Sequence, residues 1–288
     1  MAGSKEIKRR IQSVRNTKQI TSAMKMVSAS KLRRVQNEVG KADIYQKKLS
    51  NILAAVAEHA GEMALDPLLV ERPLKNSLYV VFASNKGLAG GYNSHLLKFA
   101  LEAIKKDVQN GIHPSVIAVG KKAEDFFKRQ GIAVLDAFLG VNDVPTSQDA
   151  DAISRSLRSF YIKEETDAVY LIYQKFFTVM HQEPTLAKLL PVEKLPEAED
   201  GQRPDYIFEP NAEAILEKLL PLYVDAQIHR ALTDAKAGEH GARMTAMTAA
   251  TDNATELIAD LELSYNRARQ AAITAEITEI VAGVNALS

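Results

Sequence analysis

The chain has 288 residues, of which 46% are hydrophobic and 25% are charged, and its formal net charge is zero. It has no cysteine, which excludes disulfides, thiolate metal sites and thiol catalysis. No uncharged apolar run approaches the roughly 18–20 residues of a membrane span, and the N-terminus lacks an apolar signal region. We therefore expect a protein without direct membrane insertion, kept in a cytoplasm-like compartment.

The first segment, residues 4–58, is predicted to be a helix. Its apolar residues recur mostly at steps of three, four or seven, which is the spacing of one helix face. They are Ile7, Ile11, Val14, Ile20, Met24, Val27, Leu32, Val35, Val39, Leu49, Ile52 and Val56. Residues 1–60 carry 13 Lys/Arg and 4 Asp/Glu, a net charge of +9, and ten of the basic residues lie between Lys5 and Arg34.

The middle of the chain is predicted to alternate strands and helices. All ten prolines lie between Pro67 and Pro221, so only the two ends are free of this helix-breaking residue. Alternation of this kind indicates a mainly parallel sheet with right-handed crossovers. The expected strands are residues 78–83, 115–119, 133–135 and 168–173, with 186–192 as an additional edge strand, and the expected helices are residues 94–109, 121–129 and 147–163. Residues 197–204 are predicted to form an exposed loop.

A glycine-rich loop, residues 84–93, follows the first predicted strand and opens the next helix. Such a loop can cradle a phosphate, because helix N-termini and glycine backbones bind anions. Its sequence fits neither established nucleotide-binding glycine pattern. A tight strand-to-helix turn requires the same glycines, and this structural role is favoured over nucleotide binding.

No pattern in the sequence indicates a catalytic or metal site. The six histidines show no metal-ligand spacing, and we interpret them as surface or interface residues: His59, His95, His113, His181, His229 and His240. Neither a Gly-x-Ser-x-Gly elbow nor an obvious pair of carboxylates is present. We expect no catalytic residues, no metal and no cofactor.

The last segment, residues 222–288, carries the most regular pattern. Along one side of this segment, which we call the seam, apolar and small residues recur at alternating steps of three and four for over four heptads. This spacing is typical of a coiled coil. The seam residues are Met244, Met247, Thr251, Ala254, Ile258, Leu261, Tyr265, Ala268, Ala272 and Ala275. Residues 239–288 carry 3 Lys/Arg and 7 Asp/Glu, a net charge of −4, opposite in sign to the first segment.

The two terminal helices are expected to pair with each other, because a helix with one apolar stripe must bury it. The sequence therefore predicts an α/β fold plus a long antiparallel α-helical coiled coil. The expected parts are an N-terminal coiled-coil helix at 1–73, a central α/β domain at 74–208 and a C-terminal coiled-coil helix at 209–288. The seam residues are small, so other subunits are expected to support the pair.

The basic first helix has two possible partners, nucleic acid or an acidic protein surface. An apolar stripe runs through the same stretch, which favours a packed helix with basic flanks. No aromatic residue precedes Tyr45, so side chains that stack on bases are absent there. An acidic protein partner is favoured, and a coiled-coil nucleic-acid binder and a nucleotide-dependent enzyme remain as alternatives.

Four strings of residues resemble the gamma subunits of F-type ATP synthases of the bacterial type. Residues 7–32 resemble the opening helix of that family, and 239–247, 249–254 and 265–274 resemble its C-terminal helix. The resemblance implies an antiparallel coiled coil of the two termini and a central domain that is Rossmann-like in shape. It also implies a rotor that couples rotation of a membrane-embedded c-ring to conformational cycling of the catalytic sites.

The resemblance implies partners and a location as well. The partners would be the alpha, beta and epsilon subunits and the c-ring, with Mg-ATP or ADP bound by partner subunits. The complex would lie at the cytoplasmic face of the plasma membrane, with this chain as a peripheral, noncatalytic subunit.

Residue roles follow from the resemblance only at matched positions. The catalytic ring would contact Met24, Lys25, Arg269, Gln270 and Thr274. An acidic loop of the catalytic subunit would face Lys8, Arg9, Lys31, Arg33 and Arg34. The c-ring and epsilon would lie near residues 205–210, including Tyr206 and Glu209. The sequence departs from the family where Asn85 and Ala89 replace the usual Asp and Cys, and where Gly241 replaces the usual Ala.

Overall fold

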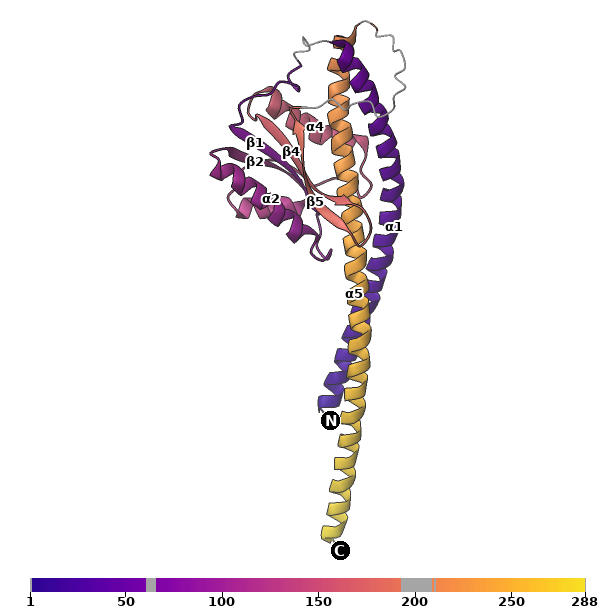
Figure 1. The fold of residues 1–288 in the computed structure, drawn as a ribbon. Coiled ribbons are helices and arrows are strands. Elements are labelled where there is room, and N and C mark those ends of the chain that lie inside the picture. The colour runs from indigo at the N-terminus through magenta and orange to yellow at the C-terminus, as the bar shows by residue number, and fades with distance from the viewer. Residues whose placement is uncertain (1, 61–65, 193–208, 210, 288) are drawn as a thin grey trace. The chain divides into compact units, whose positions relative to one another are not determined.

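The computed structural model of the chain describes residues 2–60, 66–192, 209 and 211–287 (Figure 1). It divides into two compact units, Met1–Ser28 with Arg243–Ser288, here called the helix-pair unit, and Ala29–Ala242, here called the α/β unit. Helices α1 (Ala2–Ala60) and α5 (Ala212–Leu287) each contribute to both units. This division cuts both terminal helices and does not test the expected domain boundaries at residues 73 and 208. Those boundaries stay a prediction.

The α/β unit contains a five-stranded sheet with the order β3-β2-β1-β4-β5. Its first four members are parallel, and β5 pairs antiparallel with β4 at one edge. The strands are β1 (Asn76–Phe82), β2 (His113–Val119), β3 (Val134–Phe138), β4 (Ala168–Phe176) and β5 (Gln182–Leu190). The connecting helices are α2 (Tyr92–Gln109), α3 (Lys121–Arg129) and α4 (Ser147–Ile162). The predicted strands, helices and edge strand are therefore confirmed, while the predicted loop at 197–204 lies outside the described residues.

Both faces of the sheet are covered, which is the usual arrangement of a parallel sheet. Side chains alternate along β1, so Leu78, Val80 and Phe82 join the core formed with α1, α4 and α5. The intervening Tyr79 and Val81 join the second core, formed with α2 and α3. The central strand is thus buried on both sides, and α5 is an integral part of one of the two cores.

Helix α5 begins within the part expected at 209–288, but before residue 222, where the regular segment was expected to start. It starts at Ala212 and contains Pro221, whereas the pattern of prolines placed its start after that residue. The Asn211 side chain caps the new start by accepting a hydrogen bond from the Ala214 N–H at 2.8 Å. A proline inside a helix costs about 3 kcal/mol. Burial of Leu216 and Leu220 in the sheet core offsets that cost, since each such side chain contributes about 1.5–3 kcal/mol.

The two helices of the helix-pair unit are antiparallel. Arg15 of α1 forms an ion pair with Glu262 of α5, and Thr21 Oγ1 lies 2.8 Å from Thr251 Oγ1. The partner residue number on α5 falls as the number on α1 rises, as an antiparallel pair requires. The predicted coiled-coil arrangement is therefore confirmed for this unit.

The seam of α1 differs in part from the predicted stripe. Ile20, Val27 and Ile52 were expected to be buried, but they are exposed to 59%, 53% and 36%. The polar residues Thr21 and Ser28 take the buried positions instead, because they continue the spacing set by Ile11, Val14, Leu32 and Val35. Their hydroxyl groups donate to backbone carbonyls one turn earlier, so their burial leaves no donor unsatisfied.

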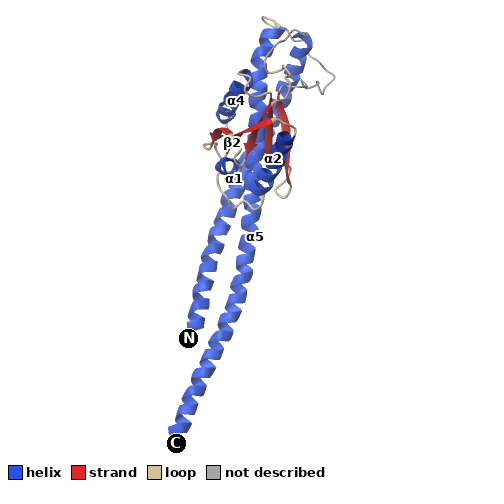
Figure 2. Cartoon of the chain, turned by 90° about the vertical axis from the view of Figure 1, so that its left-hand side faces the viewer, coloured by secondary structure: helices blue, strands red, loops and turns tan. Residues whose placement is uncertain are grey.

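The seam of α5 follows the prediction closely. Met247 and Ala254 are buried, and the neighbouring seam residues from Met244 to Ala272 are half-buried. Ala275 is exposed, so the seam ends there. Helix α5 continues past the N-terminal end of α1 (Figure 2), which leaves its last turns without a facing helix in this unit.

Candidate partner-binding surfaces

The crevice at the carboxyl ends of the strands is where α/β sheets of this kind bind ligands. Ligands enter at the point where successive connections leave to opposite faces of the sheet. Here that point lies between β1 and β4, because α2 packs on one face and α4 on the other. The space beside it is filled by α5, whose Leu232, Ala235, Lys236 and Glu239 line a remaining cavity of about 10 Å³. Such a cavity is about the size of one water molecule.

A direct hydrogen bond fastens α5 to this crevice. The Tyr92 hydroxyl, at the start of α2, donates to the Ala235 carbonyl of α5 at 2.8 Å. Gly238 of α5 packs closely against the same tyrosine ring, since a Cβ added there would lie 3.2 Å from Tyr92 Cε2. The chain therefore occupies its own ligand crevice with a helix.

The glycine-rich loop at residues 84–93 uses its polar groups to hold neighbouring loops. The Asn85 side chain donates to the Leu139 carbonyl at 2.8 Å and accepts from the Lys121 N–H at 2.9 Å. The Asn93 side chain accepts from the Ser84 N–H at 3.0 Å. These bonds join the loops that follow β1, β2 and β3, and they give the loop a structural role.

The residues expected to contact a catalytic ring lie at two levels of the helix-pair unit. Lys25 is exposed and Met24 is half-buried on α1, whereas Arg269, Gln270 and Thr274 are exposed on α5. The pairing of Thr21 with Thr251 places Lys25 opposite about residue 247 of α5. Arg269 is about 20 residues further along that helix, which corresponds to about 30 Å. The structure thus forms two separate surfaces and does not bring these residues together.

The basic residues expected to face an acidic loop divide between the two units. Lys8 and Arg9 are exposed on the helix-pair unit, at the level of Arg269. Arg33 and Arg34 are exposed on the α/β unit. Lys31 differs from the other four, because its ammonium donates to the Asp143 carboxylate of the same chain at 2.6 Å.

Asp143 is the centre of a charged network that joins three elements of the α/β unit. It lies between Lys31 of α1 and His240 of α5, whose Nε2 is 3.7 Å from the carboxylate. Burial acts to raise the pKa of Asp143, but the hydrogen bond from Lys31 and the nearby charges of Lys31, His240 and Lys236 outweigh it. The net effect is a pKa below the ordinary aspartate value.

The burial of His240 is a correction to the sequence analysis. His240 is 1% exposed, although all six histidines were interpreted as surface or interface residues. It is buried because it lies on the side of α5 that faces the loop containing Asp143, a contact nearly a hundred residues away in sequence that no local pattern reveals. His95, His113 and His181 are exposed as expected, His229 is half-buried, and the side chain of His59 lies outside the described residues.

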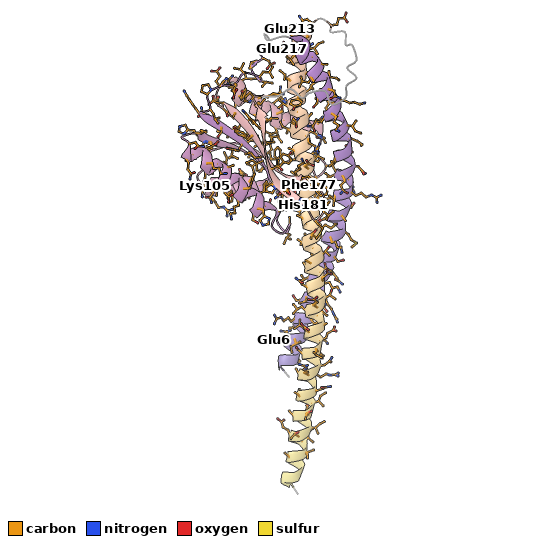
Figure 3. All side chains as sticks on the ribbon, in the orientation of Figure 1. Glu6, Lys105, Phe177, His181, Glu213 and Glu217 are labelled. Carbon is orange, nitrogen blue, oxygen red and sulfur yellow. The ribbon has the colours of Figure 1, made fainter. Side chains whose placement is uncertain are left out.

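The turn between β4 and β5 carries an exposed aromatic pair. Phe177 and His181 lie side by side with ring centroids 5.2 Å apart (Figure 3), and Lys175 Nζ lies 5.3 Å from the Phe177 ring. Met180 at the same turn is 82% exposed. These side chains form a small amphipathic surface at the end of the hairpin.

The last turns of α5 contain a surface that the sequence analysis did not identify. Ile273, Ile277, Ile280 and Val281 are exposed to 47–63% in the part of the helix where the seam with α1 ends. Large apolar side chains grouped in this way indicate a partner surface. The spacing of the seam predicts only which residues of this helix are buried against α1. These isoleucines lie outside the seam, so that spacing did not identify them.

The residues expected near a c-ring can be located only in part. Glu209 is exposed just before the start of α5, and Tyr206 lies outside the described residues. Within the described residues no cluster of three or more metal-ligating side chains is present. No helix in that part of the chain is long and apolar enough to cross a membrane.

Comparison with known proteins gives one consistent result over the full length. Residues 3–287 match the family model described as ATP synthase. The chain is 46% identical to an ATP synthase gamma chain of Desulforamulus reducens and 45% identical to one of Desulfitobacterium hafniense, each over 287 residues and the whole of both chains. Among solved structures it is similar in fold to a chain of the Euglena gracilis mitochondrial ATP synthase, in a structure of its OSCP, F1 and c-ring. That similarity has a TM-score of 0.69 at 17% identity, covering 99% of this chain and 95% of the other.

Proposed function

This chain belongs to the ATP synthase gamma chain family, and from that premise we propose that it is a noncatalytic rotor subunit whose helix-pair unit turns within a ring of catalytic subunits. Rotation of a membrane-embedded c-ring would be transmitted through the chain to the catalytic sites. Each site would pass in turn through binding, synthesis and release of ATP. The same coupling run in reverse would use ATP hydrolysis to drive rotation.

The observation that carries this proposal is the antiparallel helix pair with unlike exposed sides. Around the seam, α1 presents basic residues such as Lys8 and Arg9, while α5 presents acidic residues such as Glu262 there and apolar ones such as Ile277 beyond the end of α1. A rotor can shift its partners between states only if it contacts them differently at different angles, because equal contacts shift no equilibrium. A pair of helices with different chemistry on each side meets this requirement.

The noncatalytic part of the proposal rests on the occupied crevice. Leu232, Ala235, Lys236 and Glu239 of α5 fill the place where an α/β sheet would hold a nucleotide. A nucleotide could enter only if α5 left the core that contains Leu220, Val224 and Ile228. Mg-ATP and ADP would therefore be bound by partner subunits, and the chain would need no cofactor of its own.

The residue roles that the resemblance suggested become part of the proposal with one change. Met24, Lys25, Arg269, Gln270 and Thr274 would form two contact levels within the catalytic ring. Lys8, Arg9, Arg33 and Arg34 would face an acidic loop of the catalytic subunit, with a smaller contribution from Lys31 because Asp143 already binds it. Tyr206 and Glu209 would face the epsilon subunit and the c-ring. The complex would be attached peripherally at the cytoplasmic face of the plasma membrane.

Reconstitution tests the rotor proposal. The purified chain should join a hexamer of alpha and beta subunits and, with the epsilon subunit and the membrane sector in vesicles, couple ATP turnover to proton transport. Titration of the isolated chain with Mg-ATP in a calorimeter should give no saturable heat at micromolar concentrations. Failure to assemble would contradict the rotor role, and tight stoichiometric binding of ATP would contradict the noncatalytic role.

Charge reversal tests the acidic-loop surface. Arg33→Glu with Arg34→Glu should weaken binding to the alpha–beta hexamer at least tenfold, since like charges now oppose each other, and the loss should shrink as salt rises. Lys105→Glu is the matched control, because Lys105 is an exposed cation on α2 (Figure 3) that has no proposed role in this contact. An equal loss in the control would remove the surface assignment.

A further inference from the structure

A cavity of about 500 Å³ lies in the α/β unit between α1, the first turn of α4 and α5. Its size is within the range of small-molecule sites, which are typically about 300–1,000 Å³. Three helices form its walls, so the cavity does not depend on a loop for its shape. Its lining residues differ from those of the crevice at the strand ends, and none of the surfaces proposed above includes it.

Apolar side chains supply part of the wall. Tyr45 of α1 and Leu222 of α5 both line the cavity, and they are exposed to 53% and 45%. Ala150 and Ala226 line it as well, and both are buried in the surrounding core. A ligand with an apolar body would cover the exposed parts of Tyr45 and Leu222, which are otherwise left in water.

The charged groups of the cavity favour a cation. Among the described residues, three carboxylates line it, Glu38, Asp151 and Asp225, against one lysine, Lys41, and one histidine, His229. Lys41 is already paired with Glu38 at 2.8 Å, and the start of α4 is already capped by Thr146, whose Oγ1 accepts from the Asp149 N–H at 3.3 Å. The two features that would attract an anion are therefore satisfied within the chain.

Asp225 is the carboxylate with the weakest partner. Asp151 forms an ion pair with Arg155 at 2.7 Å, whereas the Arg158 guanidinium is 3.7 Å from Asp225 Oδ1, beyond hydrogen-bond distance. Within the described residues, this buried oxygen has no hydrogen-bond partner. In the described part of the chain, Asp225 therefore has only this long ion pair with Arg158 to balance its charge, and a cation in the cavity that it lines would add a second one.

We propose that this cavity binds an amphipathic organic amine, with its ammonium group beside Asp225 and its apolar body against Tyr45 and Leu222. An aromatic face next to a carboxylate suits this ligand, because the ring attracts the ammonium through its π electrons while the carboxylate supplies the opposite charge. A free metal ion fits less well, since much of the lining is apolar.

Dansylcadaverine is a suitable probe, because it joins an environment-sensitive aromatic group to a primary amine. Added to the full-length chain, it should give a saturable rise in fluorescence. N-acetyl dansylcadaverine, which has the same body without the charge, should bind at least tenfold more weakly, and dansyl-aminohexanoic acid should not bind measurably. Equal or tighter binding of the acid would overturn the proposal, and so would the absence of saturable binding by the amine.

Two variants locate the site. Asp225→Asn should weaken binding of the amine about tenfold and leave binding of the acetylated probe unchanged, while Ala226→Trp, which fills the cavity, should abolish both. Glu217→Gln is the matched control, because Glu217 is an exposed carboxylate on the same helix that does not line the cavity (Figure 3). Circular dichroism would confirm that each variant is folded. Unchanged binding of the amine in folded Asp225→Asn protein would overturn the proposal.

Discussion

The same two helices are stabilised in different ways in the two units of the molecule. In the α/β unit, α5 buries large side chains such as Leu216, Leu220, Val224 and Ile228 against the sheet and α4. Among the described residues of the helix-pair unit, Met247 and Ala254 are the apolar side chains that this helix buries, and the other seam residues up to Ala272 are half-buried. A seam of small side chains buries less apolar surface per turn of helix than a seam of large ones. From this comparison we expect the α/β unit to be the more stable of the two and the helix pair to depend on partners that cover its exposed surface.

Replacing one leucine in each unit tests this comparison, and it should change the free energy of unfolding more than the other substitutions. Leu220→Ala should lower the free energy of unfolding by about 2–5 kcal/mol, because it opens a cavity in a closed core. Leu261→Ala should cost only about 1 kcal/mol, because that side chain is half-buried. Urea unfolding followed by circular dichroism measures both. Equal losses would show that the helix pair is packed as tightly as the sheet core.

Shortening α5 tests the dependence on partners. Deletion of residues 280–288 removes Ile280 and Val281, whose burial by a partner would be worth at least about 1.5 kcal/mol, or about tenfold in affinity. We expect the complex with the alpha–beta hexamer to dissociate at least that much faster while most of its ATP turnover remains. Loss of turnover in a complex that stays assembled would contradict this account of the helix end.

Two glycines of α5 sharpen the comparison at the boundary of the α/β unit. Gly241→Ala should stabilise the chain by up to about 1 kcal/mol, since alanine favours the helix and the nearest atom, Gln182 Nε2 at 3.2 Å, belongs to a flexible side chain. Gly238→Ala should destabilise it, because the Tyr92 ring at 3.2 Å is held by its bond to Ala235. Thermal unfolding of the two variants gives the comparison, and stabilisation by both would show that the crevice is loosely packed.

The smallest effect is expected for loss of the Asp143 carboxylate. Asp143→Asn should lower the free energy of unfolding by less than about 1 kcal/mol, because the carboxylate is half-exposed. The folded-state pKa of Asp143 is lowered, so its stabilising contribution is present above the ordinary value of 3.8 and is lost as pH falls through the lowered pKa. Asp143→Asn should therefore be less stable than the parent chain at neutral pH and equally stable well below pH 3.8. A difference that persisted in acid would assign the effect to packing.

Local patterns predicted the parts of this fold that local physics determines. The seam of α5 could be predicted because helical spacing alone determines which side of the helix is buried, the side that carries Met247 and Ala254. The strands could be predicted because each is a short apolar run bounded by turn residues. The position of Pro221 inside α5 could not, because tertiary burial of Leu216 and Leu220 overrides a local preference.

The candidate surfaces could be predicted only where they depend on a single helix. Lys8, Arg9, Arg33 and Arg34 are exposed as the sequence suggested. The ion pair between Lys31 and Asp143 joins residues 112 positions apart, and no spacing rule reveals such a contact. The closure of the crevice by α5 also depends on residues far apart in sequence, so no local pattern could predict it.

A reversible covalent tether tests the central claim most directly. The chain has no cysteine, so Lys25→Cys introduces a single attachment point, which can form a disulfide with a cysteine placed on the facing surface of one catalytic subunit. If the helix pair turns within the ring, oxidation should stop nearly all continuous ATP hydrolysis by the assembled complex, and reduction should restore it. Undiminished hydrolysis by a fully cross-linked complex would contradict the claim.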